Sequence, residues 1–478
     1  MLQRVKVKCV RVKRVKARQM KQLEKEWIEV EFETLNLNDK RLEARAHKIV
    51  GDFSARPTGS IPEFSETWAA TKAAYNFFNN ESVSATAILA AQRQATLERM
   101  KAYRLVLGLH DTTEVNLSHF PATEGTGPLG SGKSQGFLTH STFVVTPDGL
   151  PLGLLAQESW VRSAETRGQS EQRRARPIAE KESNKWLKAL TESSVDLPPE
   201  TQLLMVSDRE SDVLEYFLHP RPAQVDLLLR ATQHRVVEGS EWLLWQTVRR
   251  TPLSGCVTIA VEAKEKQPAR TAQCQVRYQR VTVRPPKNRP AHLPKLKAVT
   301  LWAILLEEDA PPAGVTPLRW SLLTTLPVPS FDEACRLIEF YTLRWLIERF
   351  HFVLKSGCRI EERRFDTVAA SQRLLALANL VAWRLLFLTY LARLAPALPC
   401  TIALQDPEWK ALFCFIHKTQ IPPAAPPSLQ LAIRWIAQLG GFLARNADAQ
   451  PGVKVLWRGW QRLADLVQTW LIFNPPPP

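Results

Sequence analysis

Two acidic residues lie at the ends of short apolar runs, each one residue beyond the run. Asp111 comes after RLVLGL (104–109), and Asp208 comes after LLMV (203–206). If these runs are neighbouring strands, the two carboxylates and a third one from a helix form a hard oxygen site suited to Mg²⁺, and a pair of such ions cleaves phosphodiesters. The alternative is structural, because an Asp in this position also forms turns or caps a following helix, as Asp208 is placed to do.

The segment Tyr341–Lys355 (YTLRWLIERFHFVLK) has the spacing of one continuous helix with two different faces. At about 100° per residue, four polar groups fall within a stripe about 60° wide, opposite an apolar side. These groups are Tyr341, Arg344, Glu348 and Lys355. We expect the apolar side to pack into a core and the stripe to face a single target. The alternative is a solvated face, since Arg344 and Glu348 have the spacing of an i,i+4 ion pair.

The octapeptide at 127–134 (GPLGSGKS) matches the phosphate-loop pattern G-x-x-x-x-G-K-S. Such a loop needs a strand before it and a helix after it, because the amides and dipole of the helix hold the phosphates. Here the preceding HFPATEGT is typical of a loop, and the following QGFLTHSTFVV is typical of a strand. We therefore expect no ATP to bind at this segment.

The chain has 478 residues, with 63 Lys and Arg against 47 Asp and Glu, and a formal net charge of +16. This excess indicates a polyanionic partner, nucleic acid or acidic lipid. Residues 1–23 hold nine basic and no acidic residues, which leaves +7 for the remainder. The position of particular charges is therefore more informative than their total.

The composition, 45% hydrophobic and 23% charged, excludes a disordered chain, a collagen-like chain or a membrane bundle. Seven scattered cysteines without a C-x-x-C pair argue against a disulfide framework and fit a reducing cytoplasm. No H-x-x-x-H pair occurs, which argues against a zinc hydrolase.

The apolar stretch Leu374–Ala392 contains two polar residues, Asn379 and Arg384, so we expect a buried helix and no membrane contact.

Periodicity divides the chain into parts and predicts an α/β fold. Residues 35–100 have helical spacing, and short strand-like runs with acidic ends follow. Four β-branched runs predict a β-rich insertion: Val257–Val261, Gln275–Val283, Ala298–Leu306 and Trp320–Thr325. Helices return at 331–395, and two more are expected at Leu429–Leu443 and Val453–Phe473. The predicted parts are a basic tail (1–25), a helical domain (26–102), a core (103–224 and 331–395), the insertion (225–330) and a helical C-terminal region (396–478).

Three motifs together resemble one known family. They are D-T-T at Asp111, D-R-E-x-D at Asp208, and Y-x2-R-x3-E-x6-K from Tyr341 to Lys355. In this combination they resemble the DDE transposases of the insertion-sequence-4 family, which are bacterial cut-and-paste enzymes with a ribonuclease-H-like catalytic core. The resemblance extends from about residue 27 to about residue 473, includes Glu180–Leu187 (EKESNKWL), and leaves out the basic tail.

The resemblance implies a role for each candidate residue. Asp111, Asp208 and Glu348 would form the catalytic triad and bind two Mg²⁺ ions, for which Mn²⁺ would substitute. DNA contacts are implied for Tyr341, Arg344, Lys355, Arg230 and Trp320. Trp320 would stack on a base flipped out of the element end, and its alternative interpretation is a core aromatic.

The implied activity is DNA transposition in the cytoplasm, at the nucleoid. Hydrolysis would free a 3′ hydroxyl, which attacks the opposite strand to give a hairpin. A second hydrolysis would open the hairpin, and the blunt end would join target DNA without ATP. The implied partners are double-stranded DNA, as inverted repeats and as target, and a second copy of the chain in a synaptic homodimer.

The resemblance also assigns the two helical regions. Residues 26–102 would recognise the element ends, and residues 396–478 would dimerise. Two other functions stay open. One is a catalytically silent regulator that binds DNA ends, against which the intact triad argues. The other is a structure-specific nuclease, against which Trp320 and the end-binding helices argue.

Overall fold

The computed structural model describes residues 4–5, 27–130, 132–163, 175–261, 269–287, 289–445 and 450–475. The chain divides into two compact units. The first, called the sheet unit, comprises Met1–Arg11, Arg104–Asp111 and Gly168–Trp345. The second, called the helical unit, comprises Val12–Tyr103, Thr112–Arg167 and Leu346–Pro478. Most of the predicted basic tail lies outside the described residues.

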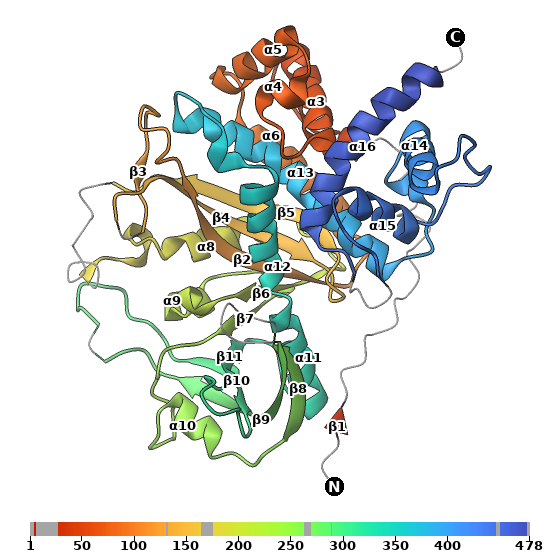
Figure 1. Ribbon diagram of the computed structural model, residues 1–478. Coiled ribbons are helices and arrows are strands. Elements are labelled where there is room, and N and C mark those ends of the chain that lie inside the picture. Colours follow the sequence, from red (N-terminus) through yellow and green to blue (C-terminus); the bar gives the residue numbers. More distant parts are fainter. Residues whose placement is uncertain are drawn as a thin grey trace. The chain divides into compact units, whose positions relative to one another are not determined.

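The strands of the sheet unit form a mixed sheet in the order β1–β8–β9–β10–β11–β7–β6–β2 (Figure 1). Their bounds are β1 (Arg4–Val5), β2 (Leu105–Asn116), β6 (Gln202–Ser207), β7 (Val225–Arg230), β8 (Gly255–Val261), β9 (Arg270–Val283), β10 (Val299–Glu308) and β11 (Arg319–Thr324). The neighbours β2, β6 and β7 run parallel, whereas β7, β11, β10, β9 and β8 alternate in direction. Parallel strands that are covered on both faces are nearly all apolar, which explains the runs that precede Asp111 and Asp208.

The helices of the sheet unit are α8 (Asn184–Ser193), α9 (Leu214–Leu218), α10 (Leu244–Arg249) and α11 (Phe331–Thr342). Ser330 caps helix α11, which begins at Phe331: its hydroxyl accepts the N–H of Glu333 at 3.2 Å. Its apolar face is buried, and it packs against β7. This packing places the end of α11 near the end of β7.

The helical unit contains α2 (Trp27–Glu31), α3 (Lys40–Ala55), α4 (Ile61–Ser65), α5 (Trp68–Asn79), α6 (Ala85–Met100), β3 (Gly127–Pro128), β4 (Gln135–Val145), β5 (Pro151–Trp160), α12 (Trp345–Phe352), α13 (Val368–Leu394), α14 (Asp406–His417), α15 (Leu429–Leu439) and α16 (Val453–Phe473). Several of these helices have a side-chain cap at their N-terminus. Asp39 caps α3, Thr67 caps α5, Ser84 caps α6 and Thr367 caps α13. These caps satisfy amide groups that the first turn of each helix leaves free.

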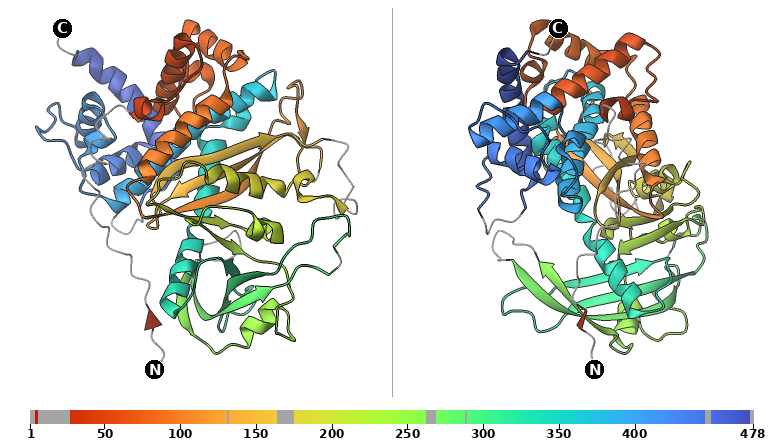
Figure 2. Two further views of the ribbon diagram at one scale, coloured as in Figure 1. Left: turned by 180° about the vertical axis from the view of Figure 1, so that it is seen from behind. Right: turned by 90° about the vertical axis from the view of Figure 1, so that its right-hand side faces the viewer.

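Helix α13 runs through the middle of the helical unit and contacts α3, α5, α6, α15, α16 and β5 (Figures 1 and 2). It is long and apolar enough to cross a membrane, but 94% of its most apolar stretch is buried in the fold. Its polar groups are satisfied inside: Asn379 pairs with Gln157 of β5, and Arg384 donates to the carbonyl of Ile402 at 3.1 Å. The expectation of a buried helix at Leu374–Ala392 is confirmed.

The last two helices, α15 and α16, pack so closely that their backbones touch. A Cβ at Gly459 would lie 1.8 Å from the carbonyl oxygen of Ile436, and one at Gly440 would lie 1.8 Å from that of Val455. Only glycine fits at these two positions, since it has no side chain. The two predicted C-terminal helices are thus confirmed, although α15 ends at Leu439 rather than at Leu443. Helix α14 was not among the helices predicted from the sequence.

The chain is therefore of the mixed α/β class, with a helical N-terminal region, a central mixed sheet and a helical C-terminal region. The four predicted strands of the insertion correspond to β8, β9, β10 and β11. The strand predicted after the sequence GPLGSGKS is β4, so this segment lacks the helix that a phosphate loop requires.

Candidate catalytic and DNA-binding site

Three consecutive parallel strands of the sheet unit bring charged residues to one edge. Leu109 of β2 pairs with Val206 of β6, and Ser207 of β6 pairs with Leu229 of β7. Continuing this register sets Asp111 level with Asp208, and Asp208 level with Arg230. Neighbouring strands lie about 4.8 Å apart, so these three residues are adjacent at the carboxyl edge of the sheet, the usual place for a site in α/β folds.

Asp208 lies just after β6 and caps the short 3₁₀ helix Arg209–Ser211. Its Oδ1 accepts the N–H of Glu210 at 2.9 Å, so the capping interpretation is confirmed for one carboxylate oxygen. Burial, and then the charge of Glu210, raise the pKa of Asp208, while Arg344 and Lys185 act in the opposite direction. A partly buried carboxylate of this kind is stabilised by a bound cation, which compensates for the lost hydration.

Arg344 lies in the short turn after α11 and is next to the other aspartate, Asp111. Its Nη1 is 4.0 Å from Oδ2 of Asp111, and both side chains are about one-fifth exposed. Arg344 also donates a hydrogen bond to the hydroxyl of Tyr341. The guanidinium therefore lies between an acidic residue of β2 and the end of α11.

Tyr341 is buried at the end of α11 and links the remaining residues of this edge. Burial raises its pKa, which the charges of Arg344 and Arg230 lower. Arg230 hydrogen-bonds Tyr341 and also donates to the carbonyl of Arg319 at 2.9 Å. Burial lowers the pKa of Arg230, and the nearby Tyr341 opposes this change.

Trp320 of β11 is half-buried and packs edge to face on Tyr341, with 5.3 Å between ring centroids. It is therefore not a fully buried core residue. The sheet unit thus gathers six of the residues expected to act on DNA: Asp111, Asp208, Arg230, Trp320, Tyr341 and Arg344.

Lys185 of α8 is a further charged residue at this edge, and the motifs did not single it out. Its side chain is only 7% exposed, and its Nζ lies 3.1 Å from Oε2 of Glu210, two residues after Asp208. A buried ammonium needs such a partner because an isolated charge is costly to remove from water. The available signal was its place in the stretch Glu180–Leu187, which belongs to the family resemblance.

Glu348 and Lys355 belong to the helical unit. Glu348 is exposed on α12, whereas Leu346, Ile347 and Phe350 on the same helix are buried. The ring of Phe350 stacks on Phe143 of β4 with 4.6 Å between centroids, which anchors the apolar side of α12. The structure therefore confirms one apolar and one exposed side for this part of the segment.

The expectation of one continuous helix from Tyr341 to Lys355 is wrong. Helix α11 ends at Thr342, α12 begins at Trp345, and a π-helix (Val353–Gly357) contains Lys355. The amides of Leu343 and Arg344 bond to carbonyls only three residues back, which tightens the turn, and the amide of Cys358 bonds five residues back to Val353, which widens it. Both changes alter the angle per residue, so the angles of a single helix do not apply across the segment, and Tyr341 is buried rather than exposed.

Asp111 and Asp208 fit a magnesium site by the chemistry of their oxygen donors. Oδ2 of Asp208 makes no hydrogen bond within the described parts of the chain, and is thus available as a ligand. Over these same parts, no group of three His, Cys, Asp or Glu side chains is arranged to hold a metal ion. The assignment of the triad to a metal thus stays a prediction.

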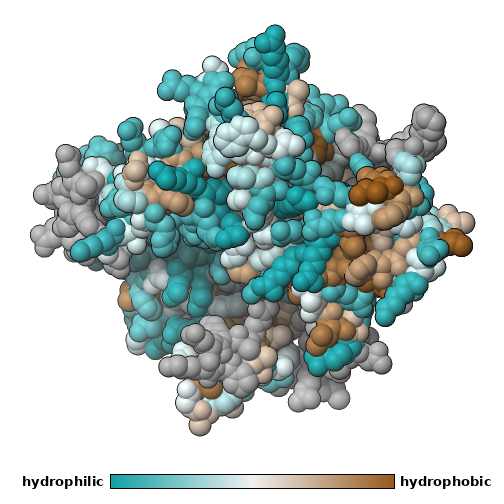
Figure 3. Space-filling model, turned by 45° about the horizontal axis from the view of Figure 1, so that its top comes forward, coloured by the Kyte–Doolittle hydropathy of each residue, from teal (hydrophilic) through white to brown (hydrophobic). Residues whose placement is uncertain are grey.

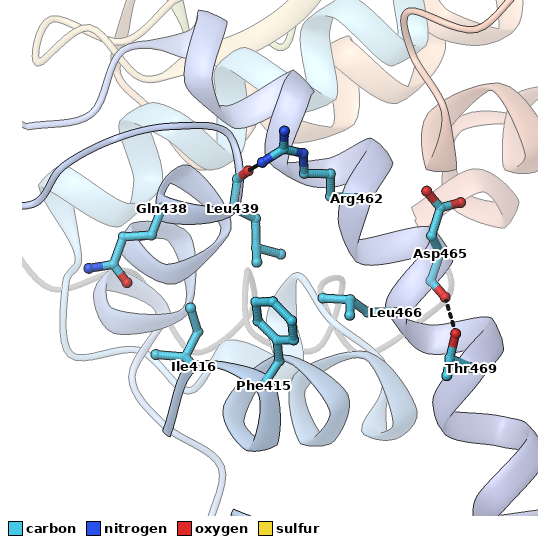
Figure 4. A pocket seen from close by; sticks show the side chains of 8 residues that line it. All are labelled: Phe415, Ile416, Gln438, Leu439, Arg462, Asp465, Leu466 and Thr469. Atoms are coloured by element: carbon cyan, nitrogen blue, oxygen red, sulfur yellow. Dashed lines mark hydrogen bonds between the residues drawn. The ribbon is translucent and has the colours of Figure 1, made fainter. Parts of the chain in front are cut away.

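The C-terminal helices present apolar side chains at the surface. Figure 3 shows hydrophobic groups gathered on one side, and the exposed large residues of this region are Phe415, Ile421, Leu431, Leu443, Leu471, Ile472 and Phe473. A hollow of about 410 Å³ lies between α14, α15 and α16, with Phe415 and Leu466 pointing into it (Figure 4). Arg462 closes one side by donating to the carbonyl of Leu439 at 2.6 Å. Exposed apolar surface of this extent is typical of a protein interface.

Two family models match the chain. Residues 24–83, which include α2 to α5, match the transposase DNA-binding family. Residues 380–471, which include the end of α13 and helices α14 to α16, match the Tn5 transposase dimerisation domain. The chain is therefore similar to Tn5-like transposases in a DNA-binding region and in a dimerisation region.

Proposed function

We propose that this chain is a DNA transposase that binds the terminal inverted repeats of an insertion element, cuts the element out and joins it to target DNA. The observation that supports this most is the parallel register of β2 and β6, in which Leu109 pairs with Val206 and which, when continued, sets Asp111 level with Asp208 at the carboxyl edge. The edge lies in the part of the chain between two regions that match transposase families. We further propose that residues 103–224 and 331–395 form a ribonuclease-H-like core, interrupted by the β-rich insertion.

In this proposal Asp111, Asp208 and Glu348 hold two Mg²⁺ ions, which Mn²⁺ replaces. When bound, these ions supply Lewis-acid activation of the scissile phosphate and an acidified water. The side chains of the protein orient the scissile phosphate and exclude other geometries of attack on it. Cutting proceeds by hydrolysis, then hairpin transesterification, then a second hydrolysis. Neither strand transfer nor cutting needs ATP, since transesterification conserves the phosphodiester.

The cationic residues hold the DNA backbone beside the carboxylates. Arg344 and Arg230 offer planar guanidinium groups, which match phosphate geometry, and Lys355 supplies a point charge. Tyr341 keeps the two guanidinium groups in place through its hydroxyl. Trp320, half-buried beside Tyr341, is placed to stack on an extruded base, which offsets the cost of extrusion.

Two copies act together in this proposal. The apolar surface of α14 to α16 forms the homodimer, and the helices within residues 26–102 recognise the element ends. We place this activity at the cytoplasmic nucleoid.

The test is excision in vitro. The DNA on either side of the gene supplies the inverted repeats, which are placed around a marker. Purified protein with Mg²⁺ should release the marker, and the Asp208→Asn variant should bind the repeats without cutting. Binding by the wild type without any cutting identifies a regulator instead, and normal excision by Asp208→Asn contradicts the triad.

A further inference from the structure

Within the helical unit, the ammonium group of Lys355 forms an ion pair with a carboxylate. Nζ of Lys355 lies 3.2 Å from Oε1 of Glu361, and the two side chains are 30% and 25% exposed. At this partial burial the pair is less screened by water than a surface ion pair. Neither the motifs nor the family matches assign a role to Glu361.

The same oxygen of Glu361 is also bonded to the backbone of β2. The N–H of Asn116, the last residue of β2, donates to Oε1 at 2.8 Å. The backbone of a strand is fixed by its ladder, so this bond fixes the carboxylate independently of Lys355. Glu361 therefore provides a fixed point to which the flexible four-carbon side chain of Lys355 attaches.

The segment between the two residues is shaped to bring them together. Lys355 lies in the π-helix, and Gly357 ends it where a Cβ would come within 2.8 Å of the Trp457 ring. Arg359 then takes a left-handed conformation (φ 52°), after which Ile360 is buried at the start of the short helix that carries Glu361. A π-turn followed by a left-handed residue is an uncommon path for a chain, and such departures are frequent at functional sites.

We propose that Glu361 is a positioning residue that holds the Lys355 ammonium in place for a phosphate of the element end. This inference rests on the proposed function, in which Lys355 contacts DNA. An ammonium has three N–H groups, so one donates to Glu361 and the others remain for a phosphate oxygen. A Lys that is already held in place loses less conformational freedom when DNA binds.

The adjacent Glu362 is a matched control. Its Oε2 accepts from Nε of Arg359 at 2.7 Å, and both side chains are about half exposed. Glu361 and Glu362 thus have the same chemistry and adjacent positions, but different partners. Of these two glutamates, Glu361 forms the ion pair with Lys355, whereas Glu362 pairs with Arg359.

The experiment compares Glu361→Gln, Lys355→Ala, the double variant and Glu362→Gln with the wild type. Full-length proteins are tested for affinity to duplex DNA carrying the element end, and for the rate of first-strand nicking with Mg²⁺. Glu361→Gln should slow nicking about tenfold, as removal of a supporting partner typically does. Since Glu361 acts through Lys355, the double variant should be no slower than Lys355→Ala. Glu362→Gln should nick at the wild-type rate.

Two outcomes overturn the inference. One is a wild-type rate for Glu361→Gln while Lys355→Ala is slow. The other is a further slowing by Glu361→Gln in the Lys355→Ala background, which would indicate a purely structural role. Thermal unfolding shows whether a variant is folded. If Glu361→Gln misfolds, Glu361→Asp, which keeps the carboxylate, is used in its place.

If the wild type binds without nicking, the transposase proposal fails. Glu361 is then judged by affinity alone, which both single variants should weaken equally.

Discussion

The strand edge of the sheet unit and the segment Tyr341–Lys355 place their polar residues by different means. At the strand edge, the pairing of Leu109 with Val206 is enough to set Asp111 level with Asp208. In the segment, α11, α12 and a π-helix replace the single helix that the spacing indicated. Strand register fixes the relative positions of residues that are far apart in sequence. The angle per residue of a helix fixes such positions only while the helix is unbroken.

The largest expected effect concerns the strand edge. Asp208→Asn and Asp111→Asn should each slow nicking about 10³-fold or more, because a lost metal ligand removes several kcal/mol of transition-state stabilisation. Affinity for the element end should change little, since both residues are acidic and are not proposed to bind DNA. The measurement is single-turnover nicking beside a gel-shift assay. Asp148→Asn, in an exposed turn, serves as control. Full activity in either edge variant contradicts the proposed role of the edge.

A smaller effect is expected where the edge and the segment meet. Arg344→Lys keeps the charge near Asp111 but loses the planar fork that also reaches Tyr341. Nicking should fall about tenfold, which corresponds to the loss of one charge-assisted hydrogen bond. Nicking kinetics at several salt concentrations measure this loss. A rate equal to that of the wild type would mean that only the charge of Arg344 matters.

Trp320 should affect a single step. Trp320→Ala should slow hairpin formation about fivefold, because base stacking on an aromatic ring contributes at least about 1 kcal/mol. First-strand nicking should be unchanged, and Trp320→Phe should restore part of the hairpin rate. Denaturing gels separate nicked from hairpin products. Equal slowing of both steps would instead assign Trp320 to the packing of Tyr341.

The smallest effect is on stability. Burial raises the pKa of Asp208 above its ordinary value of 3.8, so its ionised form destabilises the fold at neutral pH. Asp208→Asn should therefore raise the melting temperature at pH 7 by about 1–3 °C. This gain should disappear as the pH falls through the raised pKa toward 3.8, where native Asp208 becomes protonated. A gain that is the same at pH 7 and pH 4 would contradict this cause.

Much of the fold was predictable, because strands of the insertion and the long helix α13 have continuous patterns that tertiary contacts reinforce. The strand-end position of Asp111 and Asp208 was predictable for the same reason. The breaks around Arg344 and Lys355 were not predictable. They depend on backbone hydrogen bonds between residues three or five positions apart, which the periodicity of side chains does not reveal. Glu361 was missed because its partners, Lys355 and the amide of Asn116, are brought together only by the fold.

Above all, we propose that Asp111 and Asp208 bind metal together with Glu348. With added hydrogen peroxide and ascorbate, Fe²⁺ bound in place of Mg²⁺ reduces the peroxide to hydroxide and a hydroxyl radical, which cuts the nearby protein backbone, and ascorbate returns the Fe³⁺ to Fe²⁺. In the complex with element-end DNA, we expect cuts beside residues 111, 208 and 348, all of which should disappear in Asp208→Asn. Cuts beside 111 and 208 without one beside 348, or no localised cuts at all, would contradict this proposal.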